Sequence, residues 1–207
     1  LAEVFKNLES GGAHNINLVT PTHLSDKIIE ALKIYKPNIP VVYNTSGYET
    51  PEIIEKLKNY IDIFLTDIKY FSPELSQKYS KAANYFQYAS AAVLQMRKNQ
   101  PEDIFENGLM KKGLIIRHLV LPNCTNDTIK ILEWTRQNLG EKTYISLMSQ
   151  YTPCYNSKSF PEINRKLKPI EYKAITLKAI NLGFENIYIQ ELNSSSTEYI
   201  PKWNTGI

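Results

Sequence analysis

The clearest structural signal in the chain is the segment Ile61-Asp62-Ile63-Phe64-Leu65-Thr66-Asp67-Ile68-Lys69. Its nearly continuous run of apolar residues is typical of a strand buried on both faces of a parallel sheet. Asp67 and Lys69 are two positions apart, so both side chains leave the same face of the strand near its carboxyl end. Five further runs have the same character: Ile16–Val19, Pro40–Tyr43, Leu114–Leu121, Thr143–Met148 and Asn186–Leu192.

Helical patterns separate these runs. Thr50-Pro51-Glu52 and Ser72-Pro73-Glu74 each place a capping residue before a proline in the first turn of a helix. Further helices are expected from residue 1 to the Gly11-Gly12 pair, from Ser25 to Pro37, and over residues 85–96, 125–139 and 169–182. This alternation predicts an α/β fold, an open, partial parallel β/α barrel of about six strands with outer helices, similar to a TIM barrel. An open doubly wound sheet is the alternative.

The composition indicates one domain over residues 1–207, with an irregular C-terminal tail over residues 193–207. The net charge of +3, from 24 basic and 21 acidic residues, is too balanced to favour a nucleic-acid partner. No apolar run approaches the ~18 residues that a membrane span needs. Cys124 and Cys154 fit no zinc or cluster spacing, so we expect two free thiols and a cytoplasmic protein.

Polar residues gather where the predicted strands end, which is where β/α barrels carry their functional groups. Asp67 and Lys69 require a partner or a ligand at the end of a buried strand. Arg117 shares a strand face with Ile115 and Leu119 and is predicted to point into the barrel, toward Asp67, Glu191 or an acidic ligand. His118 then points outward, as a hydrogen-bonded histidine of the core.

Six segments in this order resemble the radical S-adenosylmethionine (SAM) proteins related to pyruvate formate-lyase activating enzyme. They are Gly12 to His23, Tyr43 to Tyr48, Asp67 to Tyr70, Ile116 to Pro122, Ser146 to Tyr151 and Gln190 to Leu192. The resemblance extends from Leu1 to about Pro201. It implies a partial parallel barrel that binds SAM and, through a Cys-x3-Cys-x2-Cys loop after the first strand, a 4Fe–4S cluster.

In this family, the reduced cluster cleaves SAM to a 5′-deoxyadenosyl radical, which abstracts a hydrogen atom from a substrate or from a glycyl-radical protein partner. Flavodoxin or ferredoxin donates the electron. By position, the resemblance makes Thr20 and Thr22 part of the segment that binds the methionine amine. The other cofactor-binding residues that it implies are Asn44 and Thr45 near the sugar or a cation, Asp67 and Lys69 near the carboxylate, and Arg117 and Leu119 along the cofactor.

The largest departure from the family is that the chain contains no Cys-x3-Cys-x2-Cys motif. The first strand and its cysteine loop would lie upstream of Leu1, so we expect no cluster on this chain and no activity from it as given. We therefore assign no catalytic residue and no metal ligand. Two alternatives remain: a non-catalytic barrel that binds a ligand, and a metal-dependent hydrolase with His23, Asp67 and His118 as ligands.

Overall fold

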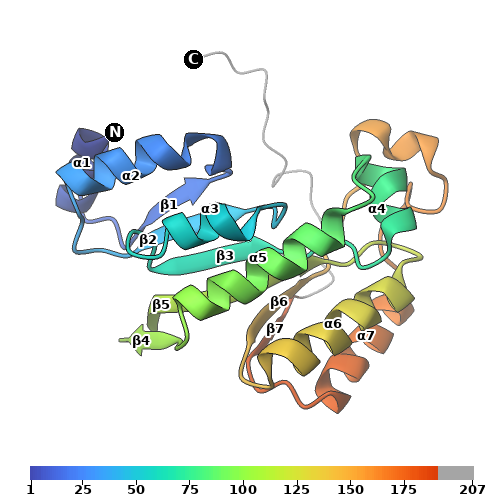
Figure 1. The fold of residues 1–207 in the computed structure, drawn as a ribbon. Coiled ribbons are helices and arrows are strands. Elements are labelled where there is room, and N and C mark those ends of the chain that lie inside the picture. The colour runs from blue at the N-terminus through green and yellow to red at the C-terminus, as the bar shows by residue number, and fades with distance from the viewer. Residues whose placement is uncertain (191–207) are drawn as a thin grey trace.

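A computed structural model describes residues 1–190 of the chain and contains one curved sheet (Figure 1). Six strands pair in the order β1-β2-β3-β5-β6-β7, and each neighbouring pair on this path is parallel. The strands are β1 (Ile16–Val19), β2 (Val41–Thr45), β3 (Ile63–Asp67), β5 (Leu109–Leu119), β6 (Tyr144–Met148) and β7 (Ile187–Ile189). This confirms the predicted open parallel β/α barrel. The predicted tail, 193–207, lies outside the described residues, as do Glu191 and Leu192 at the end of the last run.

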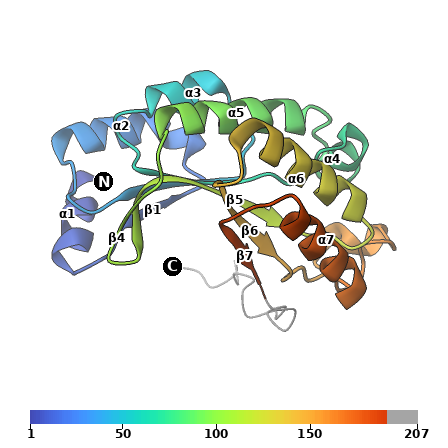
Figure 2. The same ribbon diagram turned by 90° about the horizontal axis from the view of Figure 1, so that it is seen from below.

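Most of the helices lie along the convex face of the sheet (Figure 2). Because successive strands are neighbours in the sheet, each connecting helix is laid beside the previous one rather than on the opposite face. The helices are α1 (Ala2–Ser10), α2 (Ser25–Ile34), α3 (Pro51–Lys56), α4 (Pro73–Ser80), α5 (Tyr85–Asn99), α6 (Thr125–Leu139) and α7 (Pro169–Asn181), with short 3-10 helices η1 (Thr22–Leu24) and η2 (Tyr155–Ser159). None of the helices within residues 1–190 is long and apolar enough to cross a membrane.

Local capping explains where two of these helices begin. The Thr50 hydroxyl accepts the backbone N–H of Ile53 at 3.4 Å, and the Ser72 hydroxyl accepts the N–H of Leu75 at 3.2 Å. Each cap satisfies one of the N–H groups that the first turn of a helix leaves without a partner. Both predicted helix starts are confirmed.

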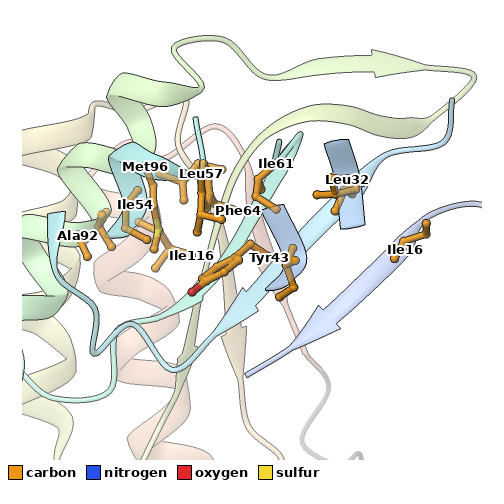
Figure 3. Close-up of a cluster of buried hydrophobic side chains, with 14 of the residues drawn as sticks. Ile16, Leu32, Tyr43, Ile54, Leu57, Ile61, Phe64, Ala92, Met96 and Ile116 are labelled. Carbon is orange, nitrogen blue, oxygen red and sulfur yellow. The ribbon is translucent and has the colours of Figure 1, made fainter. Parts of the chain in front are cut away.

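The hydrophobic core lies between the convex face of the sheet and its helices (Figure 3). Tyr43 and Phe64, from adjacent strands, are fully buried and pack edge to face with their ring centroids 6.1 Å apart. Helices α3 and α5 cover them with Ile54, Leu57 and Met96, all fully buried. Burial of this apolar surface stabilises the sheet.

The opposite, concave face of the sheet, called the inner face below, is more accessible. Along β5, buried residues such as Leu114 and Ile116 alternate with partly exposed ones, Ile115 and Arg117. This alternation follows from the two-residue period of a strand. The inner face is therefore the surface on which a ligand can meet several strands at once.

One element departs from the predicted alternation of helices and strands. Strand β4 (Ile104–Glu106) pairs antiparallel with the first residues of β5, which begins at Leu109 and not at Leu114. Asn107 and Gly108 turn the chain between them, with φ angles of 51° and 77°. Two residues with positive φ are characteristic of a tight hairpin turn, and asparagine followed by glycine favours it.

Candidate functional site

A cavity of about 350 Å³ lies on the inner face at the carboxyl ends of β3, β5 and β6. Four of the residues predicted from the sequence line it: Asp67, Lys69, Arg117 and Leu119. The other lining residues are Tyr70, Leu121, Met148, Gln150 and Tyr151. We call this the polar cavity. Its volume lies within the range of small-molecule sites, and its place in the barrel is the one that enzymes of this architecture use.

The charged groups of the polar cavity form one network. Asp67 and Arg117 are direct partners across β3 and β5, and the guanidinium Nη2 lies 2.8 Å from the carboxylate Oδ1. Arg117 also donates to the side-chain oxygen of Asn44 at 2.8 Å. The Lys69 ammonium lies 3.7 Å from the other carboxylate oxygen of Asp67, and its side chain is 44% exposed. Two cations surrounding one carboxylate leave a local charge of +1, which favours an anionic group on the ligand.

Tyr85, at the start of α5, holds the strand ends that carry this network. Its hydroxyl donates to the backbone oxygen of Ser46 at 2.8 Å and accepts the N–H of Lys69 at 3.0 Å. Burial raises the pKa of Tyr85, so the hydroxyl keeps its proton for this bond. The sequence indicated only a helix that begins at Tyr85, and a helical position does not reveal which loops its hydroxyl reaches.

Two predicted residues, Thr22 and Thr45, lie outside the polar cavity. Their hydroxyls both donate to one carboxylate oxygen of Glu49, each at 2.5 Å. Thr45 is buried because it follows Asn44, and neighbouring strand residues point to opposite faces of the sheet. The hydroxyl of Thr45 is engaged by Glu49, a residue that the sequence did not single out. The expectation that Thr45 lies near the sugar or a cation stays a prediction.

The other two predicted residues at this end of the sheet differ in exposure. Thr20 is exposed, has a positive φ of 51°, and donates its backbone N–H to the oxygen of Asn44 at 2.8 Å. Asn44 is partly buried and reaches the charge network through Arg117. The structure thus joins Asn44 to Asp67, Lys69, Arg117 and Leu119, and places the side chains of Thr20, Thr22 and Thr45 apart from them.

His118 is buried beneath the helices, as predicted. Its Nδ1 lies 2.6 Å from the backbone oxygen of Ile68, and its Nε2 lies 2.8 Å from the hydroxyl of Thr128. Asp67 lies on the opposite, inner face of the sheet. His118 and Asp67 are therefore not placed to bind one metal ion, as the hydrolase alternative requires. Within residues 1–190, no group of three or more His, Cys, Asp or Glu side chains could hold a metal ion.

We expect the stability of the protein to fall in mild acid because of His118. Burial lowers the pKa of His118 below its ordinary value of 6.5, so the folded protein binds this proton less readily than the unfolded chain. The contribution of neutral His118 is fully present above about pH 6.5 and is lost as the pH falls toward the lower, folded-state pKa. At about pH 5.5, one unit below the ordinary pKa, the loss reaches at most about 1.4 kcal/mol. Urea unfolding of the wild type and of His118→Gln at about pH 7.5 and pH 5.5 measures this loss of stability. An equal pH dependence of stability in both proteins would contradict its assignment to His118.

The cysteines of the described residues do not fit an iron–sulfur cluster. Both are free; Cys124 is buried and Cys154 is exposed. Burial raises the pKa of Cys124 to about 11, which disfavours the thiolate that a metal needs. A 4Fe–4S cluster requires several converging thiolates. The residues of 1–190 therefore do not fit this group.

The fold and site together define a class: an open parallel β/α barrel with a charged cavity at the carboxyl ends of its strands. No family model matches the chain. A curated relative, the uncharacterized protein MJ0674 of Methanocaldococcus jannaschii, is 35% identical over 182 residues, which are 84% of this chain and 48% of the relative. The chain thus spans about half the length of that relative.

A solved structure with the same fold is a domain of pyruvate-formate lyase-activating enzyme from Bacteroides vulgatus. The two superpose with a TM-score of 0.61, over 86% of this chain and 98% of that one, at 12% sequence identity. At this identity the likeness shows the fold, and it confirms at that level the resemblance predicted from the sequence.

Proposed function

We propose that this chain is the SAM-binding part of a radical enzyme related to pyruvate formate-lyase activating enzyme. The observation that carries the proposal is the polar cavity, where Asp67, Lys69 and Arg117 meet on a barrel of that fold. The full-length protein would use a 4Fe–4S cluster held by residues outside those described. As the resemblance implies, that cluster and SAM together would supply the chemistry for hydrogen abstraction from a substrate or a glycyl-radical partner.

The charges of the polar cavity suit a ligand with both signs of charge. SAM carries an ammonium, a carboxylate and a sulfonium. The exposed ammonium of Lys69 is free to move toward a carboxylate, because its 3.7 Å contact with Asp67 is loose. Asp67 is held by Arg117 from the neighbouring strand, so it presents its remaining acceptor positions to a cationic group in a fixed direction.

The apolar lining suits the rest of such a molecule. Leu119, Met148 and Tyr151 border the charged groups on the same cavity wall. Side chains of this kind bury a nucleoside while a few polar groups orient it. The residues of this chain would thus bind and orient SAM and exclude water from it, and the proposed electron donor, flavodoxin or ferredoxin, would act on the cluster.

We expect the isolated chain to bind SAM weakly, with a Kd near 1 mM, because the iron that would chelate the amino acid end is not part of it. Arg117→Gln will weaken this binding by about tenfold or more, since it frees Asp67 from its partner and lowers the positive charge. Arg97→Gln is the matched control: Arg97 forms a comparable ion pair with Asp103, 3.0 Å away, and lies outside the polar cavity. Calorimetric or NMR titration measures both. A micromolar Kd would contradict the expected need for the iron. Undetectable binding, or equal effects of the two variants, would contradict the proposed SAM site.

A non-catalytic binding domain is the second candidate, and the cysteine pattern of the described residues favours it. The two candidates differ in the full-length protein. If the protein is a radical enzyme, anaerobic incubation with SAM and dithionite will yield 5′-deoxyadenosine, and Arg117→Gln will reduce the yield. A full-length protein that binds SAM but forms no 5′-deoxyadenosine is the binding domain.

A further inference from the structure

A second cavity, of about 290 Å³, adjoins the polar cavity at the same end of the barrel. Tyr70, Leu121 and Tyr151 line both cavities and form the wall between them. The far side of the second cavity is built by α4 and by the segment around η2, through Tyr79, Tyr155 and Phe160. We call it the aromatic chamber.

The lining of the aromatic chamber differs in chemistry from that of the polar cavity. None of its lining residues within the described chain is an Asp, Glu, Lys or Arg. The hydroxyl of Tyr70 pairs with the hydroxyl of Ser80 at 3.0 Å, and that of Tyr79 donates to Glu162 at 2.8 Å. These two hydroxyls are engaged by the protein, so Tyr70 and Tyr79 offer their ring surfaces to a ligand, beside the uncharged polar residues Cys154, Asn156 and Ser157.

The rings of the aromatic chamber are arranged to receive another ring. Tyr79 and Phe160 already meet edge to face, with centroids 5.2 Å apart. Tyr155 is 72% exposed at the chamber and has a positive φ of 48°, a conformation that costs energy for a tyrosine. Offset and edge-to-face contacts with aromatic ligands contribute beyond simple burial.

We propose that the aromatic chamber binds an uncharged aromatic group of the substrate, beside the nucleoside that the proposed function places in the polar cavity. The lining residues offer an ionised group no charged partner, so a neutral ring is favoured. The Lys78 ammonium lies 5.5 Å from the centroid of the Tyr79 ring and 5.8 Å from that of Phe160, but it is already paired with Glu162. This inference rests on the proposed function, which assigns the neighbouring polar cavity to the nucleoside of SAM. Because the two cavities share Tyr70, Leu121 and Tyr151, a ring bound in the chamber would be a neighbour of the nucleoside.

The test uses p-cresol as a neutral probe and p-toluate as an anionic probe of similar shape, titrated against the chain by saturation-transfer NMR. We expect p-cresol to bind at least tenfold more tightly than p-toluate. Tyr155→Gly, which removes an exposed ring and relieves the backbone, and Phe160→Leu will each weaken p-cresol binding about fivefold or more. Tyr88→Ala is the control, because Tyr88 is a partly exposed tyrosine on α5 outside both cavities.

Saturating SAM separates the two proposals. Unchanged p-cresol affinity in its presence supports a distinct substrate site, whereas displacement by SAM or by adenosine would assign the chamber to the nucleoside and overturn the inference. Equal binding of the two probes, or no effect of both chamber variants, would overturn it as well. If SAM fails to bind at all, the proposed function fails, while the probe titrations still decide whether the chamber binds neutral rings.

Discussion

Gly47→Ala will lower the free energy of unfolding by about 4 kcal/mol. Gly47 has a φ of 82°, and an added Cβ would lie 2.1 Å from the backbone oxygen of Asp67, where no flexible side chain can move aside. The left-handed backbone costs about 1–2 kcal/mol for alanine, and forcing apart two packed strand ends costs about 1–3 kcal/mol more. For a chain of this size, the melting temperature will fall by about 12 °C.

Gly12→Ala is the matched control for Gly47→Ala. Gly12 has the same φ of 82°, but nothing lies within 4 Å of an added Cβ. We expect Gly12→Ala to lower the free energy of unfolding only by the cost of the left-handed backbone, about 1–2 kcal/mol. Thermal unfolding measures the loss of stability in both variants, and the difference between the two losses is the cost of the clash with Asp67. Equal losses would show that the contact between the β2 turn and the end of β3 does not constrain the site.

Glu49→Ala will lower the free energy of unfolding by about 2–3 kcal/mol. Glu49 is 2% exposed and accepts hydrogen bonds from Thr22 and Thr45, which come from the ends of two different strands. Its other oxygen and the Tyr43 hydroxyl are buried without a hydrogen-bond partner in the described chain. Removing the carboxylate relieves one of these unpaired atoms, but it leaves a void and two hydroxyls without an acceptor, and we expect this loss to dominate.

Glu52→Ala provides the comparison for Glu49→Ala, since Glu52 is an exposed glutamate three residues later and should change stability little. Urea unfolding measures both variants. A double-mutant cycle of Thr22→Val and Glu49→Ala should give a coupling of about 1 kcal/mol or more. Additive losses would refute the proposed link between the ends of β1 and β2.

Much of the fold could be predicted because short-range patterns carry it. The caps at Thr50 and Ser72 lie within three residues of the groups they bond. The β4–β5 hairpin had a local signal as well, the Asn107-Gly108 pair, but the expected alternation of strands and helices obscured it. That error came from imposing one regular pattern on a segment whose turn residues indicated another.

The candidate site could be predicted from the sequence only where the two-residue period of a strand decides to which face of the sheet a side chain points. Asp67 and Arg117 each share a face with apolar neighbours, so their meeting on the inner face follows from parity once the strands are adjacent. Glu49 and Tyr85 gave no such signal. Their side chains form hydrogen bonds with residues up to 39 positions away in the sequence, and the period of a single strand or helix does not predict such a contact.

The sequence by itself determined the alternation of parallel strands and helices and the direction of Asp67 and Arg117, because a strand turns each side chain to a face set by its position alone. Only the tertiary structure decided that Glu49 takes the hydroxyls of Thr22 and Thr45, and that the segment around η2 closes an aromatic chamber against Tyr70 and Tyr79. These contacts depend on how separate elements pack, and packing is a property of the whole folded chain.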